Sequence, residues 1–224
     1  MTVDPSAVTQ ITGFHDVPDF AKGHVRDLRV RWALEEIGRP YRATLFDVFH
    51  PRPDAYLEWQ PFGQVPAFSD HHVRLFESGA ILLYLGEQDE RLMPREPQPR
   101  WEATAWSTAA LNSVEPAVMS VAMIDLFHKD KPWAAQARPE FQKLLEQRLT
   151  SLAEALDDKE WLAGRFTVAD ILMVTVLRDI RDADLMARFA NLIAYRQRGE
   201  NRPAFQRAMA DQLAAFANTE GAQS

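Results

Sequence analysis

The sequence predicts an α/β domain with a mixed four-stranded sheet, followed by an all-α domain. In residues 10–88, short apolar runs suited to strands alternate with helical patterns. In residues 101–216, long segments carry apolar residues at i, i+3, i+4 and i+7, and almost no strand signal remains. The length of 224 residues is enough for two modest domains.

The first elements form a strand–helix–strand unit. Residues 10–15, QITGFH, are a short apolar run that predicts a strand. In VRDLRVRWALEEIG, residues 25–38, apolar residues recur at helical spacing and we expect the arginines on the other face. Gly38 suits a left-handed helix end. The run at 41–48 predicts a second strand close behind, which favours a right-handed βαβ connection.

The next elements complete the first domain. After a turn-rich stretch with one short helix, QVPAF at 64–68 and HVRLF at 72–76 have the separation of a hairpin. SGAILLYLGEQ at 78–88 predicts a helix with Ser78 as its N-cap. The order β-α-β-α-β-β-α over residues 10–88 is that of a thioredoxin-like unit.

Composition predicts where the domains divide. The segment RLMPREPQPR at 91–100 has three prolines in ten residues, which indicates a linker. We therefore expect the thioredoxin-like domain in residues 1–90 and the helical domain in residues 101–216. Residues 217–224 are expected to form a disordered tail. Within the second domain, TVADILMVTVLRDI at 167–180 predicts a central buried helix.

Composition also excludes several classes of function. The chain has no cysteine, so disulfides, thiolate metal sites and cysteine nucleophiles are impossible. Its six histidines lack zinc-binding spacing and no glycine-rich phosphate loop occurs, so we expect no metal or nucleotide cofactor. A net charge of −7 argues against nucleic acid. Without a long apolar run or a secretory signal, we expect a cytoplasmic protein that does not engage a membrane.

Two short segments predict a site for a small peptide. A proline at a strand is tolerated where its N–H is not needed or where the X–Pro bond is cis. Val65, just before Pro66, can then pair its backbone with an extended peptide. Ser78, at a helix N-terminus, offers a hydroxyl and free amides to a carboxylate. Glu77 can hold an ammonium group, so the ligand would have an α-amino-acid end.

Three stretches of the chain resemble the glutathione S-transferase family, of the cytosolic, bacterial-like type. They are PFGQVPAFSDHHVRLFESGAILLYLGE at 61–87, RVRWALEEIGRPYRATLFD at 29–47 and WLAGRFTVADILM at 161–173. They occur in the family's order and at its usual separations, and the resemblance covers about residues 10–216. The combination of strand, Val-Pro, turn, strand, Glu-Ser and helix is the most specific part of the match.

The resemblance implies a glutathione site. The residues that it assigns to glutathione are Arg52, Gln64, Val65, Pro66, Glu77 and Ser78. Pro66 would be a cis-proline, and Val65 would pair with the backbone of the cysteinyl residue. Glu77 and Ser78 would hold the γ-glutamyl end, and Arg52 would face the glycyl carboxylate.

The start of the first helix departs from the family's pattern, because the usual tyrosine, serine or cysteine is missing. A thiol of pKa about 8.5 is mostly protonated at neutral pH, so some donor must stabilise the thiolate. The candidates are backbone amides at the helix start, the charged side chain of Arg26 or Arg29, and His24 as donor or base. Phe20 would line the thiol pocket. The alternatives are salt bridges for the arginines, a loop position for His24 and core packing for Phe20.

Other residues are assigned to the helical domain. Trp106, Met119 and Met123 on the fourth helix are expected to wall the pocket for a second substrate, with core packing as the alternative. Thr167 and Asp170 match the family's N-capping box. We therefore assign Asp170 to folding.

The resemblance implies a glutathione transferase that uses glutathione as co-substrate and needs no other cofactor. Its thiolate would attack a small hydrophobic electrophile between the domains, by conjugation or peroxide reduction in detoxification. The family pattern also implies a homodimer. Two alternatives stay open: a non-catalytic glutathione-binding, ligand-binding or regulatory module, and a glutathione-dependent isomerase or dehalogenase.

Overall fold

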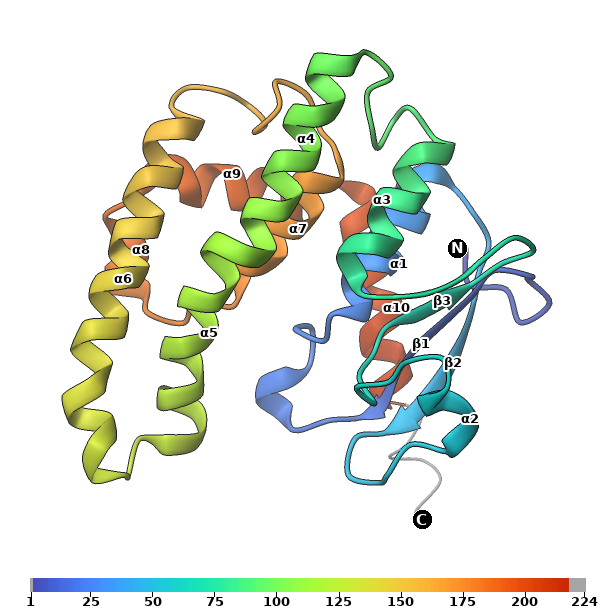
Figure 1. Cartoon of the computed structure of the whole chain (residues 1–224), viewed down its shortest axis with the longest axis horizontal. Helices are drawn as coiled ribbons and strands as arrows, with labels where there is room; N and C mark the ends of the chain where they lie inside the picture. The colour runs from blue at the N-terminus through green and yellow to red at the C-terminus, as the bar shows by residue number, and fades with distance from the viewer. Residues whose placement is uncertain (1, 218–224) are drawn as a thin grey trace. The chain divides into compact units, whose positions relative to one another are not determined.

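The computed structural model describes residues 2–217, which form two compact units (Figure 1). The first unit joins the chain up to Met93 with the segment that begins at Asn201. The second unit is Pro94–Glu200.

The first unit contains a four-stranded sheet in the order β2-β1-β3-β4. Its strands are β1 (Gln10–Asp16), β2 (Arg42–Asp47), β3 (Ala67–Ser69) and β4 (Arg74–Phe76). Strand β1 runs parallel to β2 and antiparallel to β3, which is itself antiparallel to β4. The helices are α1 (Asp27–Ile37), α2 (Asp54–Leu57), α3 (Ser78–Gln88) and α10 (Pro203–Ala217), with a 3₁₀ turn η1 at Asp19–Ala21. The predicted order β-α-β-α-β-β-α is confirmed.

Helix α1 ends as predicted, at Gly38 with φ of 66°. The prediction that the arginines lie on the outer face is wrong for the two arginines within α1. Arg29 and Arg31 are each only 2% exposed. Helix α10 packs along α1 and covers that side. The rings of Trp32 and Phe205 meet edge to face at 4.9 Å between centroids.

The boundaries of the predicted domains differ from the structure at both ends. Helix α10 lies in the first unit, so the helical unit ends at Glu200 and not at 216. Salt bridges of 2.6 Å from Arg202, just before α10, to Glu36 and from Arg207 in α10 to Glu35 join this segment to α1. Of the predicted tail 217–224, Ala217 closes α10 and the rest lies outside the described residues.

The predicted linker 91–100 is only partly a linker, because helix α4 begins within it, at Pro97. Pro97 and Pro99 both fall in the first turn of α4. An N–H there has no intrahelical acceptor, so proline costs little at that place. A proline-rich segment can therefore open a helix as well as separate two domains.

The second unit is helical throughout. Its α-helices are α4 (Pro97–Ala109), α5 (Glu115–Met123), α6 (Pro132–Leu156), α7 (Val168–Arg178), α8 (Ala183–Ala187) and α9 (Ala190–Glu200). Short π-helical segments, η2 (Ala110–Val114) and η3 (Ile124–His128), follow α4 and α5. Helix α7 is buried from Val168 to Leu177, which confirms the predicted central helix. The predicted capping box of Thr167 and Asp170 is also present.

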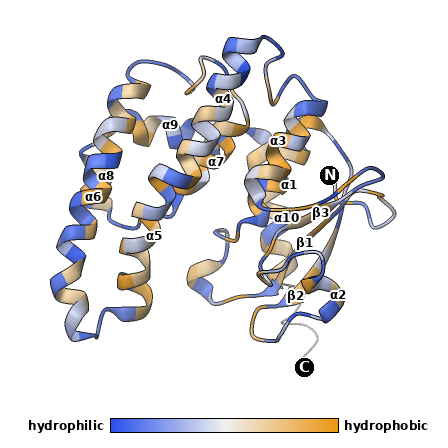
Figure 2. Cartoon of the chain, in the orientation of Figure 1, coloured by the Kyte–Doolittle hydropathy of each residue, from blue (hydrophilic) through white to orange (hydrophobic). Residues whose placement is uncertain are grey.

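One helical run among the described residues, Pro97–His128, is long and apolar enough to cross a membrane by length and composition. No such run was predicted from the sequence. Helix α4 packs against α7, and α5 packs against α6, so part of the run is core of the helical unit. Figure 2 shows a hydrophilic start in α4 and more hydrophobic residues in α5. Length and composition alone are weak evidence, since buried core helices pass the same test.

Candidate functional site

The turn before β3 contains the backbone that the sequence assigns to peptide binding. The Val65–Pro66 peptide bond is cis, as predicted. Pro66 stands just before β3 and not inside a strand. Val65 is 7% exposed, and within residues 2–217 no hydrogen bond uses its backbone N–H or carbonyl. Both backbone groups therefore remain for a ligand.

A hydrogen-bonded chain of two hydroxyls borders this turn on both sides. Oγ1 of Thr12 accepts from the N–H of Ala67 at 2.7 Å and lies 2.8 Å from the hydroxyl of Tyr56. That hydroxyl donates to the carbonyl of Gln64 at 2.6 Å. Tyr56 was not predicted from the sequence, because a tyrosine in a four-residue helix carries no motif.

The start of α3 differs in one detail from the prediction. Ser78 is the first helical residue, and Glu77 occupies the N-cap position without a side-chain cap. Glu77 has φ of 67°, which is uncommon for a residue with a side chain and costs about 1–3 kcal/mol. Such backbone outliers cluster at ligand sites. The Glu77 side chain is exposed, where a ligand ammonium group can reach it.

The buried hydroxyl of Ser78 has a charged neighbour. Nη1 of Arg29 donates to Oγ of Ser78 at 3.2 Å. The hydroxyl proton stays available to an acceptor, and the first amides of α3 point out of the helix as at any α-helix start. The structure therefore places a buried cation, a hydroxyl and helix amides together, which suits a carboxylate.

Arg52 lies in the loop before α2, where its guanidinium group contacts the protein itself. Its Nη1 donates to the carbonyls of Asp47 and His50. Its Cζ lies 4.9 Å from the ring centroid of Phe14 and 5.5 Å from that of Phe46. The side chain is half-buried, so its predicted role with the glycyl carboxylate would use donors beyond Nη1.

The three predicted catalytic residues lie in the loop between β1 and α1. Phe20 is in η1 and is 36% exposed, so it is no core anchor. His24 is half-buried, and its backbone N–H donates to the carbonyl of Ala21 at 2.9 Å. Arg26 is exposed at the N-cap of α1 and makes no side-chain cap. Their roles in stabilising a thiolate stay predictions.

The residues predicted for the second-substrate pocket lie in the helical unit. Trp106 is half-buried in α4, Met119 is half-buried in α5, and Met123 is 42% exposed at the end of α5. They occupy two α-helices of one helical run, where the sequence predicted a single fourth helix. None is fully buried, so core packing does not account for all of their surface.

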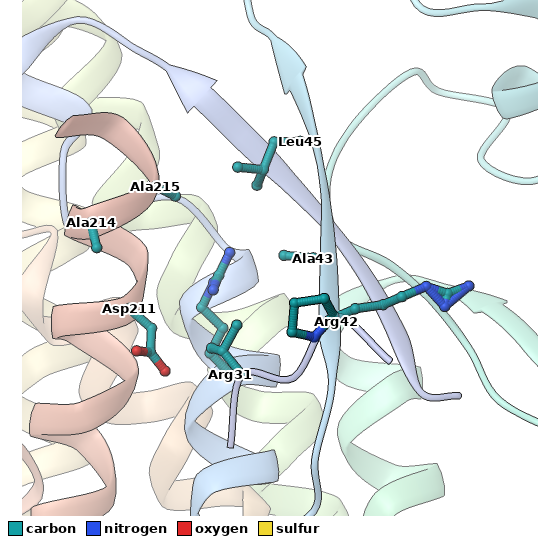
Figure 3. Close-up of a pocket in the computed structure, with 9 residues that line it drawn as sticks. Arg31, Arg42, Ala43, Leu45, Asp211, Ala214 and Ala215 are labelled. Carbon is teal, nitrogen blue, oxygen red and sulfur yellow. The ribbon is translucent and has the colours of Figure 1, made fainter. Parts of the chain in front are cut away.

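A separate cavity of about 580 Å³ lies in the first unit between β2, α1 and α10 (Figure 3). Figure 3 shows the side chain of Arg31, from α1, and those of Ala43 and Leu45, from β2. Burial raises the pKa of the Asp211 carboxyl, which accepts from the hydroxyl of Tyr41 at 3.2 Å. The lining includes no residue that the sequence assigns to glutathione. No group of three or more His, Asp or Glu that could hold a metal occurs in the described chain.

Comparison with known proteins shows the family of this chain. The family model for the glutathione S-transferase N-terminal domain matches residues 21–87, and that for the C-terminal domain matches residues 108–203. The disulfide-bond oxidoreductase YfcG of Escherichia coli is 30% identical over 155 residues, which cover 62% of this chain and 68% of that protein. The chain belongs to the glutathione S-transferase family.

Several glutathione S-transferases also match this chain. A glutathione S-transferase of Hyoscyamus muticus is 27% identical over 65% of this chain and 81% of its own. In three further curated relatives the match spans only 44%, 60% and 59% of the relative. A family member from Pseudomonas fluorescens, solved with two glutathione molecules bound, has a TM-score of 0.80. It is 24% identical, and the alignment covers 90% of this chain and 92% of that one, which shows the fold.

Proposed function

We propose that this glutathione S-transferase family member binds glutathione, stabilises its thiolate and directs it at a small electrophile. The observation that carries the proposal is the free backbone of Val65 beside a cis-proline, in the same unit as the Arg29–Ser78 pair at the start of α3. A scaffold needs neither feature. The glutathione bound to the Pseudomonas fluorescens family member supports the same ligand class.

Each end of the peptide has a chemical partner in this proposal. The α-carboxylate of the γ-glutamyl residue would accept from the Ser78 hydroxyl and the α3 amides, near the charge of Arg29. The ammonium group would meet Glu77. The cysteinyl backbone would pair with Val65 as an added strand, while Gln64 and Arg52 would border the peptide. This arrangement holds the thiol at one place, which is the first requirement of catalysis by proximity.

The thiolate would form near the start of α1. Helix-start amides and one charged donor supply what the missing hydroxyl would otherwise give. Lowering a thiol pKa by two units needs about 2.7 kcal/mol. A charged hydrogen bond contributes about 1.5–3 kcal/mol, so Arg26 with amides is enough in principle.

Replacing Ser78 with alanine tests glutathione binding. The variant should weaken binding by about 1–3 kcal/mol, because the ligand carboxylate and a buried arginine both lose a partner. Isothermal titration calorimetry with reduced glutathione measures the change. Ser120→Ala is the matched control, since the Ser120 hydroxyl donates to the carbonyl of Pro116 in its own helix. An unchanged dissociation constant in Ser78→Ala would count against the proposed site.

Replacing Arg26 with alanine tests thiolate stabilisation. The side chain is exposed and makes no side-chain cap at the start of α1, and circular dichroism of the variant verifies its fold. We expect kcat to fall with little change in glutathione affinity, and the pH profile of kcat/KM to move to higher pH by about one to two units. Lys22→Ala is the control, because Lys22 is a cation of the same loop that pairs with Asp19 at 2.8 Å. Equal pH profiles for Arg26→Ala and the wild type would remove Arg26 from the mechanism.

A second candidate is a non-catalytic glutathione-binding or regulatory module, favoured by the missing tyrosine, serine or cysteine. Glutathione binding without turnover across electrophile classes would establish it. Assays across electrophile classes would separate the isomerase and dehalogenase alternatives from conjugation. A homodimer, a cytoplasmic location and a second-substrate pocket at Trp106, Met119 and Met123 belong to the same proposal.

A further inference from the structure

The hydroxyls of Thr12 and Tyr56 form a directed chain of hydrogen bonds. A phenol carries one proton, and that of Tyr56 goes to the carbonyl of Gln64 at 2.6 Å. The hydroxyl of Thr12 must therefore donate to the oxygen of Tyr56 across their 2.8 Å separation. The N–H of Ala67 donates to Oγ1 of Thr12 at 2.7 Å. Every proton in the chain has a defined direction.

The two ends of this chain meet the backbone on either side of Val65 and Pro66. The carbonyl of Gln64 lies just before the pair, and the N–H of Ala67 lies just after it. The pairing of β1 with β3 is given by Gln10 with Ser69 and Ile11 with Phe68. The hydroxyl chain therefore continues the attachment of the turn to β1 beyond the strand pairing.

Both hydroxyls are held away from water. Thr12 is fully buried and Tyr56 is 5% exposed. The Tyr56 ring packs on Phe46 at 4.5 Å and on Trp59 at 6.0 Å between centroids. Burial raises the pKa of the Tyr56 hydroxyl, so it stays protonated and able to donate at neutral pH. Buried hydroxyls with complete partners keep one geometry, because no solvent competes for their hydrogen bonds.

We infer that Thr12 and Tyr56 are positioning residues, which fix the backbone of Val65 for a peptide ligand. This inference rests on the proposed function, since it deepens the account of the glutathione site. Neither side chain needs to contact glutathione. Their effect passes through Gln64 and Ala67, whose backbone sets the direction of the Val65 N–H and carbonyl. A peptide paired in this way requires both groups in place at once.

The test compares Tyr56→Phe and Thr12→Val with the wild type. Each variant keeps the shape of the side chain and removes one link. We expect the dissociation constant of reduced glutathione to rise about tenfold in either, measured by calorimetry on protein whose fold is verified by circular dichroism. Thr12→Ser keeps the hydroxyl and should restore binding to within about twofold of the wild type. Tyr84→Phe is the control, because the Tyr84 hydroxyl donates to Asp70 at 2.8 Å and not to this turn.

Hydrogen exchange of the wild type gives a reading that needs no variant. The Ala67 amide should be strongly protected before glutathione is added, because its acceptor is already in place. Protection of Ala67 only after glutathione is added would overturn the inference. Binding by Tyr56→Phe and Thr12→Val within about twofold of the wild type would overturn it as well, and would leave the proposed function standing. If the wild type itself binds no glutathione, the proposed function fails first.

Discussion

Replacing Arg31 with methionine is expected to lower the free energy of unfolding by about 3–5 kcal/mol, the cost of leaving a buried charge without its partner. Nε of Arg31 donates to Oδ2 of Asp27 at 2.7 Å, and both side chains are 2% exposed. Gln212 of α10 also donates to Asp27. Gly13 lies so close that a Cβ there would stand 2.8 Å from Oδ2 of Asp27. The Asp27 carboxylate is therefore closely packed on the side of Gly13.

The loss in free energy of unfolding of Arg31→Met should depend on pH. Burial raises the pKa of the Asp27 carboxyl even with Arg31 present to oppose it. Without Arg31 the folded-state pKa rises further above the unfolded value of 3.8. A raised folded-state pKa favours the folded state at low pH and is a cost once the carboxyl must ionise. The deficit of the variant should therefore be smallest near pH 4 and grow as the pH rises.

Urea denaturation of the wild type and Arg31→Met at several pH values measures the loss in free energy of unfolding and its dependence on pH. Arg148→Met is the control, since Arg148 is exposed on α6. Asp27→Asn combined with Arg31→Met should recover part of the loss, because no charge is then left buried. A loss below about 1 kcal/mol at pH 7, or one that is independent of pH, would contradict the account.

Asp170→Ala is expected to lower the free energy of unfolding by about 2–4 kcal/mol at pH 7, while the folded protein keeps its activity. Oδ2 of Asp170 accepts from the N–H of Thr167 at 2.8 Å. Oδ1 accepts from the hydroxyl of Tyr195 at 2.8 Å and from the N–H of Leu162 at 3.1 Å. Alanine leaves all of these buried donors without an acceptor.

The pH dependence of this effect follows from burial of the carboxyl group. Burial raises the pKa of Asp170 from 3.8 to about 6. The folded state therefore binds the proton more tightly, and the stability that this group contributes falls as the pH rises from about 4 to about 6. The difference between a pKa of 3.8 and one of about 6 corresponds to roughly 3 kcal/mol of stability. The deficit of Asp170→Ala should be larger at pH 4.5 than at pH 7.

Thermal and urea denaturation at the two pH values checks the Asp170 prediction. Thr150→Ala on α6 is the control, since the exposed Thr150 hydroxyl donates to the carbonyl of Glu146 in its own helix. A variant that is as stable as the wild type but inactive would show that Asp170 serves chemistry and not folding.

Local patterns predicted most of the elements because the relevant forces act between near neighbours. Gly38 ends α1 where a left-handed residue is needed, and Thr167 with Asp170 caps α7 through contacts three residues apart. The cis bond before Pro66 agreed with the family pattern. Tyr56 was not found, because its partners lie 44 residues earlier and 8 residues later in the chain and no spacing links them.

By itself, the sequence determined the strand and helix order and the family, and it located the two segments that we propose bind a peptide, because periodicity and short motifs depend only on residues close in the chain. Only the tertiary structure decided that α10 returns to the first unit, that Arg29 and Arg31 are buried, and that two hydroxyls attach the turn at Val65. These are contacts between distant segments. A buried arginine is tolerated where a partner such as Asp27 or Ser78 offsets the lost contact with water.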